Sequence, residues 1–290
     1  MSKAEREVRL EWLRPAEIEA AQRDCPTLFQ PLGTLEWHGL HNVTGLDAVK
    51  AHMLCLAAAR RGGGLVAPPL FGGMGGLHEP HTFVIEPEDT FQSVIVRGWF
   101  ERICWEAVRQ GYRAIIFLTG HYGASQQVIL REVTVRMTRM LGVPILGVPE
   151  YFLALDAGYV GDHAGFGETS LMLYLAPHAV DLSRLGEPPF QGVGGRDPRE
   201  STAEDGQRMS EPIIARLANL AQQMPGWDAD TVRRFADAEA AIVKRQIELA
   251  AELNNIWAAW RHIGSGVMND YARLLVARKF EEIIALAHQL

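Results

Sequence analysis

Two kinds of hydrophobic pattern alternate along the chain. Short apolar runs rich in β-branched residues predict buried strands, and apolar residues that recur every three or four positions predict amphipathic helices. The strands are expected at residues 27–33, 65–71, 113–119 and 143–148. The helices are expected at residues 11–23, 46–61, 91–110, 126–141, 171–176, 202–224, 228–261 and 271–290. This alternation predicts βαβ units, in which a parallel sheet lies between helices.

The chain of 290 residues is long enough for one large domain or for a domain with an appendage. The alternating pattern occupies residues 1–225, which we expect to form an α/β domain. Residues 226–290 show helical patterns and contain no cluster of histidine and carboxylate residues. We expect this part to be a helical C-terminal extension that contributes a contact between subunits of a homo-oligomer.

Composition and charge exclude several classes of function. A net charge of -7 disfavours a nucleic-acid-binding surface, which needs concentrated lysine and arginine. The cysteines Cys25, Cys55 and Cys104 are scattered and odd in number, so we expect reduced thiols and no zinc–thiolate site. The N-terminal segment has mixed charge, and no window holds the roughly 18 consecutive apolar residues of a membrane span. We therefore expect a cytoplasmic protein without a membrane partner.

The first cluster of candidate functional residues follows the expected strand at 27–33. Glu36 and His38 are two positions apart, so in extended backbone their side chains leave the same face. Asp47 begins the next helical pattern, where a short loop folds it back toward the end of the strand. A carboxylate mixed with neutral imidazole suits zinc, manganese or iron(II). Taken alone, Glu36 and His38 are equally well explained as a buried polar pair that fixes a loop.

Two further clusters lie at similar places in the pattern. His121 directly follows the strand at 113–119 and is flanked by glycines, which let the backbone approach a ligand. His163 and Glu168 precede an apolar helix, where Glu168 either belongs to a site or caps the helix. In parallel α/β sheets, ligands bind at the carboxyl ends of the strands. The topology therefore brings the three clusters to one sheet edge and favours a metal site over the structural alternatives.

Other motifs carry weaker signals. The glycine-rich loop after the second expected strand lacks the Lys-Ser/Thr of a phosphate-binding loop and is interpreted as a turn. His78 and His81 follow it and are either solvated or line a pocket. The proline- and glycine-rich segment 186–199 is expected to rim or cover a pocket. No Gly-x-Ser-x-Gly elbow is present, which disfavours a serine hydrolase. Trp99 and Trp105 are expected in the core.

The three clusters together resemble the motifs of the creatininase (creatinine amidohydrolase) family. The matching segments, within about residues 25–225, are Glu36-Trp-His38-Gly-Leu-His41 with Asp47, Gly120-His121-Tyr122-Gly123 and His163-Ala-Gly165-Phe-Gly-Glu168-Thr-Ser170. The resemblance implies a three-layer α/β/α fold with a mainly parallel sheet, a site for two divalent ions of zinc, manganese or iron, and often a hexamer. Members of the family hydrolyse cyclic or formyl amides or, in one branch, a peptide bond. Another branch resembles hydrolases that open a dehydro-inosose (diketo-inositol) ring.

The same resemblance implies a set of metal ligands in which Asp47 bridges two ions. The first ion would be held by Glu36, Asp47 and His121, and the second by His38 and Asp47. Creatininase supplies a glutamate two residues after the glycine-flanked histidine, and Gly123 occupies that position here. Glu168 is therefore the expected replacement ligand. This departure disfavours creatinine itself as the substrate.

The expected chemistry follows from the two bridged cations, which lower the pKa of a shared water molecule and polarise a substrate carbonyl. A further group must carry protons to the leaving atom. We expect His163 in this catalytic role, with Glu168 as the alternate if Glu168 is not a ligand. The expected substrate-binding residues are His41, His78, His81 and Tyr122.

The leading hypothesis is hydrolysis of an amide C–N bond in a small cyclic substrate. The alternative is hydrolytic ring opening, with C–C cleavage, of a carbocycle of the diketo-inositol type. Two other classes are a non-catalytic scaffold that keeps the family core and a metal-dependent isomerase acting on a sugar ketone. Metal content separates the scaffold from the enzymes. Product mass separates the isomerase, because hydrolysis adds one water molecule.

Overall fold

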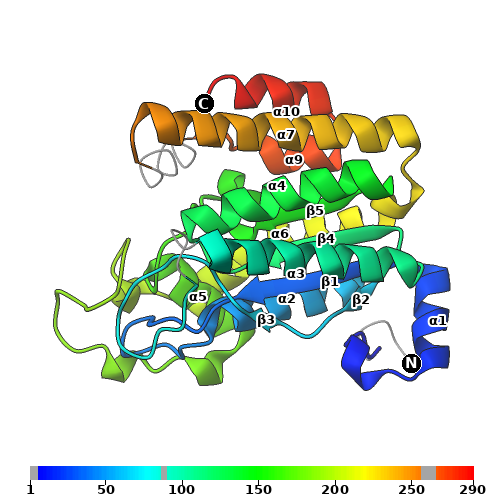
Figure 1. Ribbon diagram of the computed structural model, residues 1–290. Coiled ribbons are helices and arrows are strands. Elements are labelled where there is room, and N and C mark those ends of the chain that lie inside the picture. The colour runs from blue at the N-terminus through cyan, green and yellow to red at the C-terminus, as the bar shows by residue number, and fades with distance from the viewer. Residues whose placement is uncertain (1–5, 86–89, 256–265) are drawn as a thin grey trace.

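A five-stranded parallel sheet lies at the centre of the molecule (Figure 1). The computed structural model describes residues 6–85, 90–255 and 266–290. The strands are β1 (Thr27–Gly33), β2 (Leu65–Val66), β3 (Leu70–Phe71), β4 (Ala114–Thr119) and β5 (Ile145–Pro149). The order is β2-β1-β4-β5, and β3 pairs with the end of β1. β1 and β4 are the two central strands and are buried along their whole length, so their carboxyl ends lie next to each other in the middle of the sheet.

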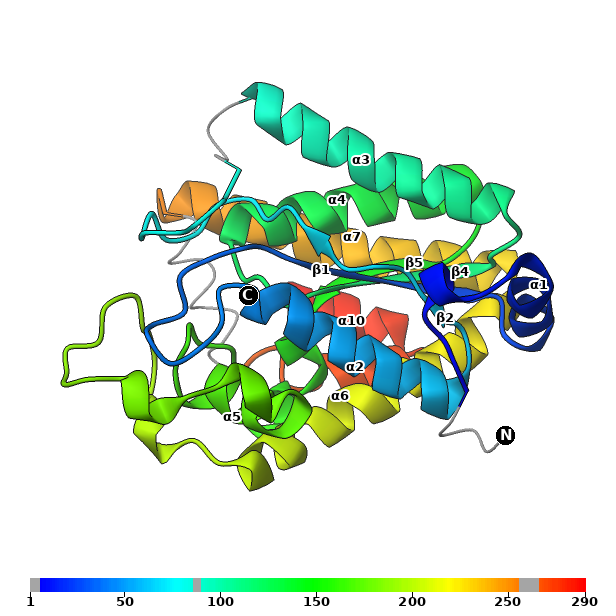
Figure 2. The same cartoon turned by 90° about the horizontal axis from the view of Figure 1, so that it is seen from below.

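Helices cover both faces of the sheet (Figure 2). On one face lie α3 (Thr90–Arg109) and α4 (Ala124–Leu141), and on the other α2 (Leu46–Gly62), α5 (Phe166–Leu175) and α6 (Ala203–Gln223). The helix α1 (Pro15–Asp24) precedes the first strand. The short 3-10 helices are η2 (Leu10–Trp12), η3 (Glu150–Leu153), η4 (Leu155–Ala157), η5 (Pro177–Ala179), η6 (Leu182–Arg184), η7 (Pro198–Glu200) and η8 (Met224–Gly226). The predicted three-layer α/β/α fold with a parallel sheet is confirmed.

Alternate residues of each strand enter two separate hydrophobic cores. Leu28 and Phe117 face α3 and α4, whereas Phe29, Ile116 and Leu118 face α2 and α6. Successive side chains of a strand point to opposite faces of a sheet, so a strand buried on both sides needs apolar residues at nearly every position. This explains why the strands appear in the sequence as continuous apolar runs.

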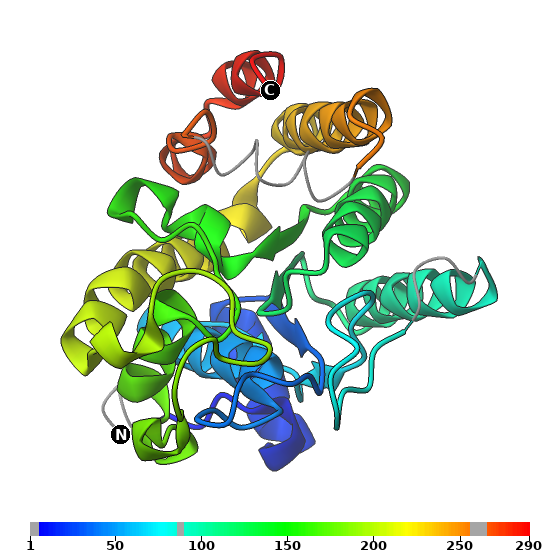
Figure 3. The same ribbon diagram turned by 90° about the vertical axis from the view of Figure 1, so that its left-hand side faces the viewer.

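The C-terminal helices stack beyond β5, the edge strand of the sheet (Figure 3). They are α7 (Ala229–Glu252), α9 (Tyr271–Val276) and α10 (Phe280–Ala287), and α7 packs on α4. The guanidinium of Arg131 on α4 is buried and donates to Glu239 of α7 at 2.9 Å, and the Tyr271 hydroxyl donates to Glu239 at 2.8 Å. These helices share a hydrophobic core with the sheet. The boundary at residue 225 and the subunit contact stay predictions.

Two predicted elements near the sheet edge differ from the structure. The strand expected at 65–71 is divided into β2 and β3, because Pro68 and Pro69 between them have no N–H to donate. The helix expected at 171–176 begins five residues earlier, at Phe166, so Glu168 lies in its first turn. Its early start places Glu168 on the helix, whereas His163 stays in the loop before it.

The predicted C-terminal helices also differ. The helix expected over 228–261 ends at Glu252, since Asn254 adopts a left-handed conformation with φ 46°. The residues of this expectation from 256 to 261 lie outside the described residues. The helix expected over 271–290 is two helices, separated where Arg278 has φ 57°. In none of the described helices is there a stretch long and apolar enough to cross a bilayer.

The prediction that Trp99 and Trp105 belong to the core is wrong. The two side chains are 44% and 47% exposed. The buried face of α3 carries Val96, Phe100 and Cys104 at helical spacing, which leaves both tryptophans on the opposite face.

Candidate metal centre

The N-terminus of α2 rests directly on the carboxyl ends of β1 and β4. A Cβ atom on Gly33 would lie 2.1 Å from the Ala48 nitrogen, and one on Gly120 would lie 2.1 Å from the Asp47 carbonyl oxygen. Glycine at both strand ends is therefore required for this close approach. The approach brings the Asp47 carboxylate, in the first turn of α2, between the loops that follow the two strands. A carboxylate in this position is also favoured by the helix dipole.

We expect the substitution Gly120→Ala to push α2 away from the sheet edge. The overlap with the Asp47 backbone should cost about 1–3 kcal/mol of unfolding free energy and reduce metal affinity, because it displaces Asp47. Thermal unfolding and metal titration measure the two effects. Gly98→Ala is the matched control, since a Cβ on Gly98 of α3 meets no atom within 4 Å. A Gly120→Ala protein with the unfolding temperature and metal affinity of the wild type would contradict the role of this contact.

A first set of donor atoms consists of Glu36, Asp47 and His121. The Nδ1 atom of His121 lies 3.1 Å from both Glu36 Oε2 and Asp47 Oδ2. Its Nε2 atom donates to the Gly75 carbonyl oxygen at 2.8 Å. This hydrogen bond fixes the tautomer and turns the lone pair of Nδ1 toward the two carboxylates. One ligand atom from each residue lies within 4.8 Å of the others, so a single ion can be reached by all three.

The glycine-rich loop over residues 72–76 positions this first set. Its Gly75 carbonyl accepts from His121, and the following Leu77 N–H donates to Glu36 Oε1 at 2.5 Å. A Cβ on Gly123 would lie 2.2 Å from the Met74 carbonyl oxygen, so the packed loop leaves no room for a side chain there. The loop interpreted from the sequence as a turn is thus part of the site.

A second set of donor atoms consists of His38, Asp47 and Glu168. The Nε2 atom of His38 lies 3.1 Å from Asp47 Oδ1 and 3.7 Å from Glu168 Oε2. Its Nδ1 atom donates to the Glu36 carbonyl oxygen at 2.9 Å. The buried Nε2 atom makes no hydrogen bond of good geometry, although the Asp47 carboxylate lies at ion-pair distance. The two oxygens of Asp47 therefore face different donor sets, Oδ2 the first and Oδ1 the second.

The donor side chains are buried, and their charges shift one another's pKa values. Burial alone would raise the pKa of Asp47, but the charges of His38 and His121 and the hydrogen bond from His121 outweigh it and hold this pKa well below its usual range. Burial alone would lower the pKa of His38, but Asp47 and Glu168 raise it to about 9. The pKa of His121 is also raised, by Asp47 and Glu36 against the effect of burial. Carboxylates and imidazoles that interact in this way are suitable ligands for zinc or manganese.

These raised pKa values predict that metal affinity increases with pH. Below pH 9 the His38 imidazole holds a proton on the nitrogen that faces Asp47, and a metal ion must displace it. Each displaced proton should lower the apparent dissociation constant about tenfold for each pH unit gained. Calorimetric titration in buffers of different ionisation enthalpy measures the protons released. Binding that releases no proton between pH 6 and pH 8 would contradict the displacement of the His38 proton by the metal ion.

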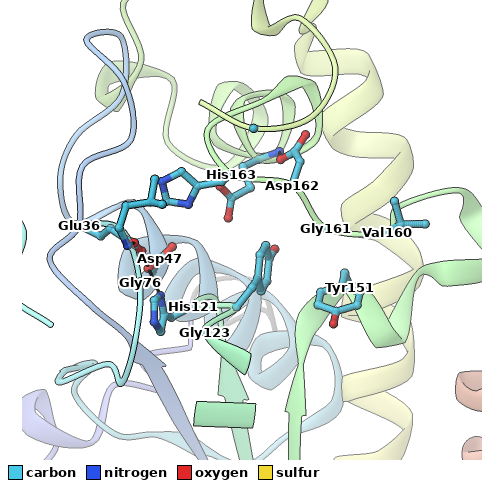
Figure 4. Close-up of a pocket in the computed structure, with 14 residues that line it drawn as sticks. Glu36, Asp47, Gly76, His121, Gly123, Tyr151, Val160, Gly161, Asp162 and His163 are labelled. Carbon is cyan, nitrogen blue, oxygen red and sulfur yellow. Dashed lines mark hydrogen bonds and ion pairs between the residues drawn. The ribbon is translucent and has the colours of Figure 1, made fainter. Parts of the chain in front are cut away.

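A cavity of about 510 Å³ opens beside the two donor sets, within the usual size range of small-molecule sites (Figure 4). His163 projects into it toward Glu36 and Asp47. The His163 Nε2 atom donates to the Trp37 carbonyl oxygen at 2.8 Å, and its ring stacks on His38 with centroids 4.4 Å apart. Burial, and secondarily the charge of His38, lower the pKa of His163. A neutral imidazole in this place can accept a proton, or it can join Glu36 and His38 as a third donor set.

The structure adds Asp162 to the cavity wall, where the sequence analysis had not placed it. Its carboxylate accepts from the N–H groups of Gly167 at 2.6 Å and Glu168 at 3.0 Å and so caps the start of α5. Burial and the neighbouring Glu168 raise the pKa of Asp162 to about 7. An aspartate a few residues before an apolar helix is a capping signal that was present in the sequence.

The segment 186–199 lies over the same cavity, as predicted from its composition. Gly194 lines the cavity and pairs with His163 in an antiparallel bridge. The Trp37 indole N–H donates to the Gln191 carbonyl oxygen at 3.0 Å. The first contact ties the segment to the loop that carries His163, and the second ties it to the loop that carries Glu36 and His38.

Of the four expected substrate-binding residues, one lines the cavity and three do not. Tyr122 lines the cavity, although its hydroxyl donates to Glu150 at 2.5 Å on the far side of its ring. His41 is buried behind His38 and lies 3.1 Å from the Thr169 hydroxyl. His78 and His81 are exposed, and the structure brings neither of them, nor His41, to the cavity wall. Their contact with a substrate stays a prediction.

Comparisons with known proteins find similar sequences and a similar fold. The family model described as "Creatininase: Creatinine amidohydrolase" matches residues 11–221. The chain is 31% identical to the creatinine amidohydrolase of Pseudomonas putida over 200 residues, covering 60% of this chain and 73% of the relative. It is 27% identical to the mycofactocin precursor peptide peptidase of Mycobacterium ulcerans (strain Agy99) over 241 residues, covering 70% of this chain and 88% of the relative. A solved mutant creatininase of Zn-Zn type superposes with a TM-score of 0.63 at 25% identity, covering 76% of this chain and 99% of its own.

Proposed function

The chain belongs to the creatininase family of hydrolases, and on this premise we propose that it hydrolyses an amide C–N bond in a small cyclic substrate with the help of two divalent cations. The observation that carries the proposal is the pair of donor sets that share the Asp47 carboxylate. The buried Nε2 atom of His38 supports it further, because it faces the carboxylates of Asp47 and Glu168 without a well-formed hydrogen bond and a bound ion would complete it. We propose zinc, manganese or iron as the ions.

The chain's own residues have distinct roles in this proposal. Glu36, Asp47 and His121 would hold one ion, and His38, Asp47 and Glu168 the other. When bound, the ions would supply an acidified water molecule and polarise the carbonyl that is attacked. His163 faces the same cavity with its Nε2 atom bonded to the Trp37 carbonyl, so its Nδ1 atom is the one available to take a proton and pass it to the leaving nitrogen.

The cavity wall favours an amide over a polyhydroxylated ring. Most of its accessible surface is apolar, with Leu77, Tyr151 and Val160 among the residues that line it. Outside the two donor sets, Asp162 and His163 are its charged or titratable groups that could bind hydroxyl groups. The Tyr151 hydroxyl donates to Gln127 at 3.2 Å, and the Tyr122 hydroxyl donates to Glu150, so neither has its proton free for a substrate. A cyclitol would lose more hydrogen bonds with water than such a wall can replace. A ring with one amide and an apolar flank matches it better.

The experiment is to load the purified protein with zinc or manganese and incubate it with lactams, formamides and diketo-cyclitols. We expect a cyclic amide to gain the mass of one water molecule and to release a new amino group. Opening of a diketo-cyclitol, with no amide cleaved, would replace the proposal with C–C hydrolysis. A product of unchanged mass would indicate an isomerase, and a protein that retains no metal would indicate a scaffold.

A further inference from the structure

One buried cation near the metal centre has no part in the chemistry described so far. Lys50 lies one helical turn after Asp47 on α2, and its side chain is fully buried. A buried ammonium group is costly unless several partners surround it. The partners of Lys50 should therefore indicate why it is there.

Lys50 contacts the segments that carry the donor sets. Its Nζ atom forms an ion pair with Glu168 Oε1 on α5 and another with Glu150 Oε1, at 2.8 Å, directly after β5. It also donates to the Tyr122 hydroxyl at 2.8 Å, next to His121, and lies 4.4 Å from the centroid of the Tyr122 ring. One ammonium group thus joins α2, α5 and the ends of β4 and β5.

The contact with Glu168 decides where that carboxylate points. Lys50 holds Oε1, while Oε2 accepts from the Ala164 N–H at 2.7 Å and lies 3.7 Å from His38 Nε2. With one oxygen held on each side, the carboxylate has a single orientation, in which Oε2 faces the second donor set. Without the ammonium group, Oε1 would be a buried acceptor beside Glu150, and repulsion between the two carboxylates would turn it away.

We propose that Lys50 is a positioning residue for the second metal ion, which orients Glu168 so that its Oε2 atom completes the set with His38 and Asp47. This inference rests on the proposed two-ion site. Residues that orient the ligands of a metal typically change its affinity by about 10–100-fold when they are removed. Among the described residues, Lys50 forms no hydrogen bond or ion pair with Glu36 or His121, the two members that belong to the first donor set alone, and its charge acts on Asp47, which both sets share. The affinity of the first ion should therefore stay close to that of the wild type.

The test compares metal binding by the wild type and by Lys50→Met, which keeps the length of the side chain and removes its charge. Metal content per subunit and competition titration with a chelator give separate affinities for the two ions. We expect the second ion to bind about 10–100-fold more weakly and the first ion to bind as in the wild type. Lys50→Gln, which is shorter and removes the charge but keeps a polar end, should show the same loss and serves if the methionine variant does not fold.

Arg131→Met is the matched control. Arg131 is also a fully buried cation, but its partner is Glu239 on α7, and neither residue belongs to a donor set. This control should lower thermal stability and leave both metal affinities unchanged. A loss of the second ion in Arg131→Met as large as in Lys50→Met would reduce Lys50 to a general structural role.

A double-mutant cycle with Glu168→Gln gives the sharpest outcome. If Lys50 acts through Glu168, Lys50→Met should cost nothing further once Glu168 is neutral, so the effects on the second ion will be non-additive. Additive effects would overturn this inference and leave the proposed function intact. Lys50 variants that fold and bind the second ion as the wild type does would have the same consequence. A wild-type protein that binds fewer than two ions would overturn the proposed function and this inference with it.

Discussion

Asp47→Asn is expected to remove both metal ions and to lower kcat/KM by about 10³-fold or more. Asp47 Oδ2 faces His121 and Asp47 Oδ1 faces His38, so the two oxygens of one side chain serve both donor sets. A carboxamide has no charge to offset a divalent cation, and it replaces one of the two oxygens with an NH₂ group that cannot act as a ligand. The loss should therefore be larger than for any residue that serves one set.

The variant is also expected to fold, which makes its metal content interpretable. Asparagine has the shape of aspartate and can still accept a hydrogen bond at the same place, so the fold should be kept, although losing the ion pairs with His38 and His121 lowers its stability. Metal analysis, circular dichroism and turnover are measured on the same preparation. Asp237→Asn, which removes a carboxylate from the exposed face of α7, is the control. An Asp47→Asn protein that retains two ions would contradict the bridging role.

The clustering of the residues in the two donor sets was predictable from the sequence because of one topological rule. Glu36, His38 and His121 follow strands that lie next to each other in a parallel sheet, and the carboxyl ends of such strands meet at one edge. Asp47 reaches them because α2 begins where β1 ends. Glu168 was correctly associated with this group, although its helix begins earlier than the apolar pattern indicates.

The residues that surround the ligands were not predictable in the same way. Lys50 follows Ala48 and Val49 in an amphipathic helix, where an isolated lysine is almost always exposed. Its burial depends on Glu150 and Glu168, which are at least a hundred positions away and which no local pattern connects to it. The same is true of Arg131, whose partner Glu239 belongs to a later helix. Buried charges of this kind are products of tertiary packing, and composition and periodicity carry no signal for them.

Elements were predicted less well where packing or backbone geometry decides their ends. The pattern of α3 alone did not distinguish its two faces, because Trp99 and Trp105 are as apolar as the residues that it buries. Similarly, the break between α9 and α10 depends on the left-handed conformation of Arg278, which is not a residue typical of helix ends. The structure settles these positions through contacts that lie outside the window of any local pattern.

His163→Ala is expected to leave metal content near that of the wild type and to lower kcat by about 10²–10⁴-fold, the usual contribution of a general acid or base. The reason is geometric. The imidazole projects into the cavity beside the donor sets, yet both sets of three are complete without it. Because burial and the charge of His38 lower the pKa of His163, the group is neutral above this pKa and can accept a proton there. Activity should therefore fall as pH decreases through the pKa of His163.

The pH profile of His163→Ala separates this role from that of a ligand. If His163 carries the proton, the acidic fall in activity that it causes should disappear in the variant, while both ions remain. If instead His163 joins Glu36 and His38 around an ion, the variant will lose metal, and added zinc or manganese will restore part of its activity. His178→Ala is the control, because His178 is exposed on η5, away from the cavity wall. Wild-type turnover in His163→Ala would exclude both roles and assign proton transfer to another group on the wall, of which Asp162 is the nearest in the chain.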